Sequence, residues 1–153
     1  MIVSTEQLEG LHGQVAMVSG GFDPLHDGHV AYFTEGAALG VPVLCNVNGD
    51  AYVSTKHPPL LLQDERARVI DALRPVSYTH VSDLTTHEVL ERLRPRYFVK
   101  GIDWEGRLPA EEVEICRRVG AEIVFLRTVL ASSSQILSRW TDHLESRSHG
   151  RAG

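Results

Sequence analysis

Short apolar runs alternate with helical patterns along most of the chain. The runs are rich in Val and Ile and are bounded by turn residues, which is typical of strands. Strands are predicted at residues 14–19, 41–47, 76–81, 96–100 and 121–126. Helices are predicted at 27–39, 63–73, 85–93 and 109–119, with a last helix that starts within 132–134 and passes Trp140. This alternation predicts a doubly wound α/β fold, a five-stranded parallel sheet with helices on both faces (Rossmann-like).

The ends of the predicted helices carry their own signals. Gly40 and Gly120 follow two of them, and glycine commonly ends a helix. Thr85 and Glu88 have the spacing of a capping box, and Pro109 suits a first helical turn. Residues 1–144 are therefore interpreted as a single domain. The polar, glycine-containing tail 145–153 is predicted to be disordered.

Composition narrows the class of protein. The chain has 153 residues, 42% hydrophobic and 23% charged, which is enough apolar material for one core. A formal net charge of −5 without a Lys/Arg run argues against a nucleic-acid partner. Neither a bilayer-spanning apolar run nor a signal peptide is visible, so no membrane partner and a cytoplasmic location are expected. Cys45 and Cys116 lack ligands at metal spacing and are interpreted as buried thiols.

The stretch from Ser19 to His29 carries the candidate chemistry. It follows a predicted strand and opens a helix, where unpaired backbone N–H groups suit phosphate oxygens. Gly20 and Gly21 allow a tight turn and a close approach of a ligand to the backbone. Because His26 and His29 lie three residues apart at the helix start, both imidazoles can donate hydrogen bonds to a polyphosphate. A zinc site is excluded because no third and fourth ligands lie nearby.

Residues 20–29, GGFDPLHDGH, resemble the GxFDxxHxGH signature of the cytidylyltransferase-like nucleotidyltransferases. The resemblance implies that His26 and His29 bind the triphosphate and stabilise the transition state. It places four further residues at the nucleotide: Gly20, Gly21, Phe22 and Gly28. By the same resemblance, Asp23 faces the acceptor or helps to hold Mg²⁺.

A second signature lies at residues 127–136, RTVLASSSQI. It resembles the RTxxxSTTxI pattern of glycerol-phosphate and heptose-phosphate nucleotidyltransferases. The resemblance assigns phosphate contacts to Arg127, Thr128, Ser132 and Ser133. Ser133 and Ser134 stand where the family commonly has threonine, and Gln135 stands where a basic residue is frequent. These departures keep the hydroxyls and change the donors available to phosphate.

Three other positions follow from the same resemblance. In residues 99–106, VKGIDWEG, the DWEG part resembles glycerol-3-phosphate cytidylyltransferases and the VKGxD part resembles the adenylyltransferase domain that makes ADP-heptose. Both imply that Asp103 lies at the nucleotide pocket. Lys56 has the place of a mobile lysine that closes on phosphates, or is an ordinary solvated lysine. Arg66 reaches the phosphates or the acceptor, or is a solvated helix arginine.

Together these segments predict a nucleotidyltransferase that uses CTP, by a slight preference, and a phosphorylated polyol, sugar or phosphonate, and releases pyrophosphate. The first alternative is an adenylyltransferase that makes an ADP-sugar such as ADP-heptose from ATP. The second is a non-catalytic nucleotide-binding module, since fold alone does not establish activity. The predicted catalytic residues are His26, His29, Lys56 and Arg127, with Mg²⁺ or another divalent cation as cofactor. The resemblance also implies a homodimer.

Overall fold

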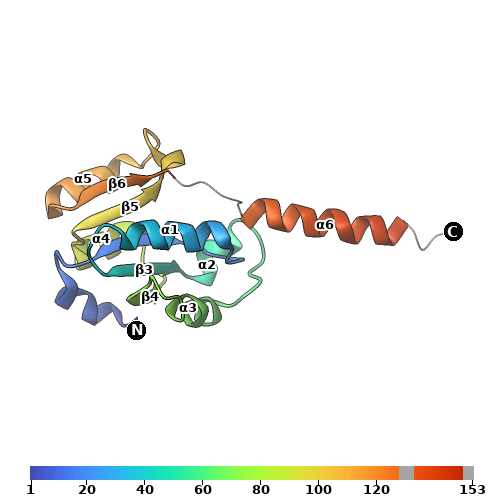
Figure 1. The fold of residues 1–153 in the computed structure, drawn as a ribbon, viewed down its shortest axis with the longest axis horizontal. Helices are drawn as coiled ribbons and strands as arrows, with labels where there is room; N and C mark the ends of the chain where they lie inside the picture. The colour runs from blue at the N-terminus through green and yellow to red at the C-terminus, as the bar shows by residue number, and fades with distance from the viewer. Residues whose placement is uncertain (128–132, 150–153) are drawn as a thin grey trace.

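Six parallel strands form the centre of the molecule. The computed structural model describes residues 1–127 and 133–149. The strands are β1 (Ile2–Val3), β2 (Ala16–Gly20), β3 (Val43–Asn48), β4 (Tyr78–Ser82), β5 (Tyr97–Gly101) and β6 (Glu122–Leu126). Their order across the sheet is β1-β4-β3-β2-β5-β6, and every neighbouring pair is parallel (Figure 1).

Helices cover both faces of the sheet. They are α1 (Asp27–Ala37), α2 (Asp50–Ser54), α3 (Gln63–Asp71), α4 (Thr86–Leu93), α5 (Ala110–Val119) and α6 (Ser133–His149), with 3₁₀ helices η1 (Thr5–Leu11) and η2 (Ile102–Trp104). On one face, Phe33 of α1 and Ile70 of α3 pack in a core with residues of β2 and β3. A second core unites Leu8 of η1, Leu90 of α4 and Ile115 of α5 on the other face. Each face of the sheet is therefore shielded from water by its own helices.

The predicted fold class is confirmed, and all five predicted strands are present. The sheet has one more strand than predicted, because β1 has only two residues and is too short to show a strand period. The sequence pattern also missed η1 and α2. Each of these short helices buries a single side chain, Leu8 and Val53 respectively, so neither has an apolar stripe to detect.

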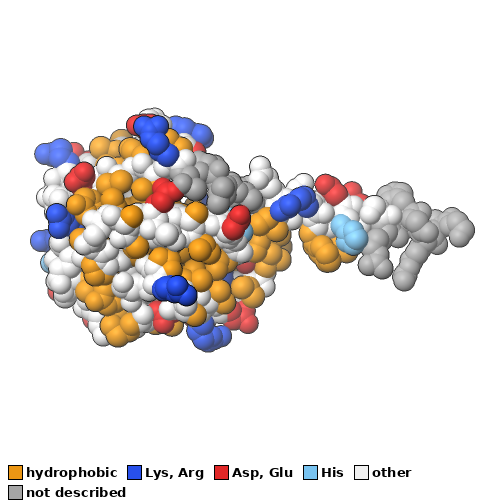
Figure 2. All heavy atoms as spheres, viewed as in Figure 1, with side chains coloured by type: hydrophobic (Ala, Val, Ile, Leu, Met, Phe, Trp, Pro, Cys, Tyr) orange, Lys and Arg blue, Asp and Glu red, His pale blue; other side chains and the backbone are white. Residues whose placement is uncertain are grey.

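The last helix, α6, projects away from the sheet (Figure 1). Hydrophobic side chains lie exposed along it (Figure 2), among them Trp140 and Leu144. The helix runs to His149, so residues 145–149, which the sequence assigned to a disordered tail, are helical. No Pro or Gly interrupts residues 133–149, and the helical hydrogen bonding therefore continues through the polar residues.

The topology directs several loops to one edge of the sheet. From β2 the chain moves outward to β3 and β4, then crosses back to β5 and moves outward again to β6. The carboxyl ends of β2 and β5 therefore border the switch point, where ligands bind in open α/β sheets. The loop before α1, the helix α2 and the helix η2 all follow strands that end at this edge.

Two other expectations concern residues away from this edge. Cys45 and Cys116 are free and buried, as predicted. The thiols therefore act as small apolar side chains of the core.

In the part of the chain that the structure describes, no helix has the length and apolar character needed to cross a membrane.

We expect Leu8→Ala to lower the free energy of unfolding by about 2–5 kcal/mol, because it leaves a cavity under η1. Leu8 is fully buried, at 0% exposure. The measurement is urea denaturation followed by circular dichroism. Leu62→Ala, at a side chain that is 61% exposed, is the control and should change stability by about 0.5 kcal/mol or less. Equal effects of the two substitutions would contradict a packed η1.

Candidate functional site

The loop between β2 and α1 has a strained residue at its centre. Phe22 adopts a φ of 52°, a left-handed conformation that bulky residues rarely take. Its buried ring packs against Phe33, with centroids 5.2 Å apart, and lies edge-on to His29, at 5.0 Å. A Cβ on Gly20 would lie only 3.0–3.3 Å from this ring, and one on Gly21 only 3.2 Å from Val53. The two glycines therefore allow side chains to pack directly on the loop backbone.

The two histidines of the signature form a stacked pair. The rings of His26 and His29 lie 3.7 Å apart with an interplanar angle of 25°. The Nδ1 of His26 accepts from the Gly28 N–H at 3.1 Å, and the Nδ1 of His29 accepts from the His26 N–H at 3.4 Å. A neutral imidazole with Nδ1 as acceptor carries its proton on Nε2. Both rings are therefore held in the tautomer whose Nε2–H can donate to a ligand.

Burial keeps this pair uncharged near neutral pH. Burial and, to a smaller extent, the neighbouring His26 lower the pKa of His29 to about 4. The pKa of His26 is lowered too, mainly by burial, against an opposing effect of Asp27. At pH 7 the two rings therefore offer neutral N–H donors to an anion, and the positive charge must come from elsewhere.

Arg66 lies inside the protein, at 1% exposure, and is not the solvated helix arginine that one interpretation proposed. Its guanidinium donates to the carbonyl oxygens of Leu61 at 3.0 Å, Gly21 at 2.6 Å and Asn48 at 2.8 Å. It also forms an ion pair with Asp50, at 2.7 Å. These partners occupy four of its five N–H groups, so Arg66 positions the backbone around the site rather than facing the solvent.

Asp23 also positions the backbone near the site, by accepting hydrogen bonds from backbone N–H groups. Its carboxylate is 3% exposed and accepts from the Leu60 N–H at 2.7 Å and the Leu61 N–H at 3.2 Å. It thereby holds the segment that follows α2 against the signature loop. Within residues 1–127 and 133–149, no group of three or more His, Cys, Asp or Glu residues could hold a metal ion.

A pocket of about 230 Å³, here called the signature pocket, lies above these residues. Its lining consists of Gly21, Phe22, Asp23, His29, Tyr52, Val53, Lys56, His57, Ser133 and Ser134. The Ser133 hydroxyl donates to the Pro24 carbonyl at 3.0 Å, which brings the start of α6 next to the start of α1. Two helix N-termini and the cation of Lys56 therefore meet at one pocket, an arrangement that suits an anion.

The structure brings together only some of the predicted site residues. Arg127 and Asp103 are exposed beyond the ends of β6 and β5 and do not line the signature pocket. Thr128 and Ser132 lie outside the described residues. The sequence pattern missed Tyr52 and His57, which line the pocket.

Tyr52 carried no usable sequence signal, because α2 has no recognisable helical stripe, and His57 lies in the segment after α2. The Nζ of Lys56 lies 4.8 Å from the centre of the Tyr52 ring, so the tyrosine supports the lysine at the rim of the pocket.

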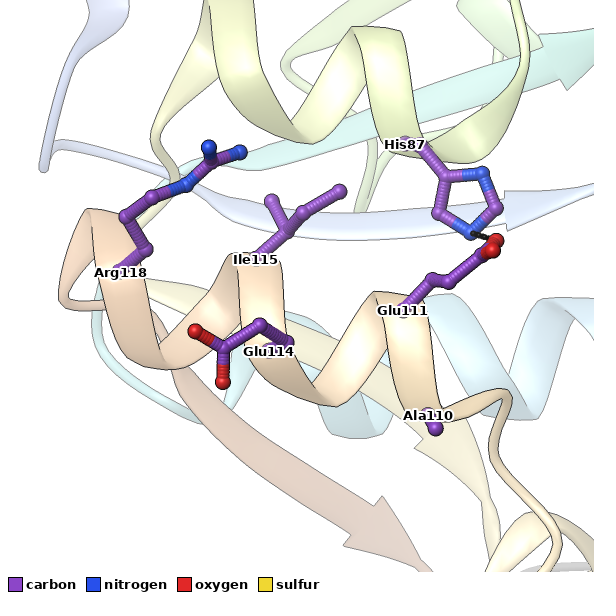
Figure 3. A pocket seen from close by; sticks show the side chains of 6 residues that line it. All are labelled: His87, Ala110, Glu111, Glu114, Ile115 and Arg118. Atoms are coloured by element: carbon purple, nitrogen blue, oxygen red, sulfur yellow. Dashed lines mark ion pairs between the residues drawn. The ribbon is translucent and has the colours of Figure 1, made fainter.

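A larger cavity, of about 550 Å³, lies elsewhere, in the groove between α4 and α5. Figure 3 shows His87 and Glu111 pointing toward one another across this groove, where the His87 Nε2 lies 3.4 Å from the Glu111 Oε2. Its lining includes the apolar Ile115 and none of the signature residues. The groove is open to the outer surface, and size alone does not connect it with the chemistry of the signature.

Comparison with known proteins gives an independent result. The model of the cytidylyltransferase-like family matches residues 17–139. Bifunctional protein HldE of Magnetococcus marinus is 34% identical over 137 residues, which cover 84% of this chain and 28% of that protein. Bifunctional protein HldE of Trichlorobacter lovleyi is 32% identical over 152 residues, which cover 92% and 30%. The chain therefore spans less than a third of the length of these relatives.

Solved structures are similar in fold. The lipopolysaccharide core biosynthesis protein of Thermoplasma volcanium has a TM-score of 0.64 at 20% identity, covering 76% of this chain and 98% of that one. Pantoate-beta-alanine ligase of Francisella tularensis has a TM-score of 0.62 at 13% identity, covering 87% and 71%. At these identities the likeness concerns the fold alone.

We expect Arg66→Ala to lower the free energy of unfolding by about 3–5 kcal/mol, because it leaves Asp50 and three carbonyl oxygens without their buried partner. Chemical denaturation measures the change. Arg68→Ala, on the exposed side of the same helix, is the matched control and should cost about 0.5 kcal/mol or less. An Arg66 variant as stable as the control would show that the network contributes nothing.

We also expect the free energy of unfolding to decrease as the pH falls from 7 to 5. Burial lowers the pKa of both His29 and His80 to about 4, whereas an unfolded chain binds protons at these residues near pH 6.5. Between these values the unfolded state binds more protons, so acidification favours it. Urea denaturation at several pH values should give a shallower slope for His29→Asn. His143→Asn, at an exposed histidine, should keep the wild-type slope; a parallel change in both variants would refute the idea.

Proposed function

Because the chain belongs to the cytidylyltransferase-like family, we propose that it transfers a nucleoside monophosphate from a nucleoside triphosphate to a phosphorylated small molecule, with release of pyrophosphate. The observation that carries the proposal is the signature pocket. There, the imidazole of His29, which stacks on His26, lies with the cation of Lys56 and two helix N-termini around one small volume. This set of donors suits a polyphosphate better than an uncharged ligand.

In the proposed reaction, an oxygen of the acceptor phosphate attacks the α-phosphorus of the triphosphate. A P–O bond forms there while the bond to the leaving pyrophosphate breaks. The attacking oxygen is already ionised at neutral pH, so the protein needs no strong general base. Catalysis then depends on positioning and on stabilisation of charge.

The predicted site residues have separate roles in this scheme. The Nε2–H groups of His26 and His29 donate to phosphate oxygens as negative charge moves toward the pyrophosphate. Lys56 supplies positive charge from the rim, and Ser133, whose hydroxyl donates to the Pro24 carbonyl, holds the start of α6 at the pocket. Asp23 positions the segment after α2, so it does not need to bind the ligand itself. Arg127, at the end of β6, keeps its proposed phosphate contact from the second signature.

The similarity to the two HldE proteins favours ATP as the nucleotide in this proposal. Both relatives named bifunctional protein HldE support the adenylyl alternative, in which AMP passes to a sugar phosphate such as a heptose phosphate. The VKGxD part of residues 99–106 agrees with it, and Asp103 is then expected near the nucleoside. CTP is the second candidate, because the DWEG part of the same segment resembles glycerol-3-phosphate cytidylyltransferases.

Three further expectations stay predictions. Mg²⁺ belongs to the proposal as the ion that accompanies the triphosphate, since Mg²⁺ commonly binds substrate phosphates together with one or two carboxylates. The homodimer and the cytoplasmic location rest on the resemblance and on the sequence.

We expect His29→Ala to lower kcat by at least about 10²-fold, because it removes a donor that acts on the developing charge. The assay is pyrophosphate release with Mg²⁺, each of ATP, CTP, GTP and UTP, and a set of sugar and polyol phosphates. Circular dichroism should show that the His29→Ala variant is folded. His143→Ala on α6 is the matched control. A near wild-type rate for His29→Ala would overturn the assignment.

The nucleotide that supports activity distinguishes the adenylyltransferase, the cytidylyltransferase and the non-catalytic module from one another. Activity with ATP alone supports the ADP-sugar proposal, and activity with CTP alone supports the second candidate. Nucleotide binding without turnover of any acceptor would make a non-catalytic binding module the better description.

A further inference from the structure

A second pocket, of about 240 Å³, opens beside the signature pocket at the carboxyl ends of β3 and β4. We call it the β3–β4 pocket; its polar lining includes Asn48, Tyr52, Ser82, Asp83, His87 and Glu112. Tyr52 lines both pockets, so the two are neighbours. A molecule whose phosphate lies in the signature pocket could extend past Tyr52 into the second one.

Glu112, which lines this second pocket, belongs to a buried pair of opposite charges with Lys100. Lys100, at the end of β5, is 8% exposed, and Glu112, in the first turn of α5, is 7% exposed. The Lys100 Nζ and the Glu112 Oε2 are 3.8 Å apart, which is ion-pair contact but beyond hydrogen-bond distance. The Nζ also lies over the ring of Trp104, 4.8 Å from its centre. The pair is therefore buried, but its two charged groups do not form a direct hydrogen bond.

The Glu112 Oε2 is buried and has no hydrogen-bond partner among the described residues. A buried carboxylate is costly unless hydrogen bonds satisfy its oxygens. Burial also lowers the pKa of Lys100, although Glu112 opposes this effect, so the ammonium is under-solvated too. Lys100 and Glu112 can therefore each form one more hydrogen bond with a polar group of a ligand.

The chemistry of the missing group follows from these two partners. It must accept a hydrogen bond from an ammonium and donate one to a carboxylate, and a hydroxyl does both at once. A phosphate fits poorly, because two carboxylates, Asp83 and Glu112, line the pocket, and the nearby cation of Lys100 is already paired with Glu112. The polarity of the β3–β4 pocket is therefore opposite to that of the signature pocket.

We propose that the β3–β4 pocket binds the hydroxyl-bearing part of the acceptor, and that Lys100 and Glu112 are specificity-determining residues that together hold one of its hydroxyls. This inference rests on the proposed nucleotidyl transfer. The acceptor is then a polyhydroxylated phosphate ester, with its phosphate toward Lys56 and its hydroxyls toward Glu112.

The test compares acceptors with and without hydroxyls. Pyrophosphate release is measured for glucose 1-phosphate, mannose 1-phosphate, glycerol 3-phosphate and ethyl phosphate. For the best polyol substrate, Glu112→Gln should lower kcat/KM by about 10–100-fold, which corresponds to the loss of one hydrogen bond to a charged group. The KM for the nucleotide and the kcat/KM for ethyl phosphate should stay within about twofold of wild type. Glu114→Gln, on the exposed side of α5 where it pairs with Arg117, is the matched control.

A second variant covers the case in which Glu112→Gln does not fold because Lys100 is left unpaired. Lys100→Met combined with Glu112→Gln removes both charges while it roughly keeps the volume, which buried pairs often tolerate. The same selective loss on polyol phosphates is expected. Thermal unfolding with the nucleotide present verifies that the variants are folded and bind it.

Each other outcome overturns a defined statement. Unchanged kcat/KM for polyol phosphates in both variants, or equal wild-type use of ethyl phosphate, overturns the inference and leaves nucleotidyl transfer intact. A raised KM for the nucleotide alone overturns it as well, because the pocket would then hold the ribose. Absence of pyrophosphate release with every phosphate ester overturns the proposed function itself, and the inference with it.

Discussion

A single buried guanidinium joins the segments from which the candidate site is built. Arg66 donates to the signature loop at Gly21, to the end of β3 at Asn48, to α2 at Asp50 and to the following segment at Leu61. A buried charge is tolerable only while its hydrogen bonds are made, so these segments cannot separate without leaving it unsatisfied. The arrangement of the loops thus depends on one side chain that need not touch a ligand.

Around this anchor the edge of the sheet is divided by charge. The signature pocket brings donors together: the imidazole of His29, stacked on His26, the lysine Lys56 and the starts of α1 and α6. The adjoining β3–β4 pocket collects acceptors, with Asp83 and Glu112 in its lining. Tyr52 stands between them. A ligand with a phosphate at one end and hydroxyls at the other matches this polarity, whereas a ligand charged at both ends does not.

Local sequence information was sufficient to predict the longer strands and the position of the signature loop. The periods of apolar residues located the five longer strands, and the loop between β2 and α1 could be singled out because a strand, two glycines and a histidine pair are contiguous. The family was accessible for the same reason, since its signature is a short continuous segment. The strand β1 and the helices η1 and α2 escaped because short elements with one buried side chain produce no period. The burial of Arg66 had a faint signal: it lies four residues before the buried Ile70, on the same helical face.

By itself, then, the sequence determined the fold class, the order of the longer elements and the segment that forms the signature loop, because each depends on residues that are neighbours in the chain. Only the tertiary structure decided that Arg66 points inward, that the start of α6 meets the start of α1, and that Lys100 faces Glu112. Each of these contacts joins residues from different elements. Their geometry depends on how helices pack on the sheet, and no local pattern of polar and apolar residues encodes that packing.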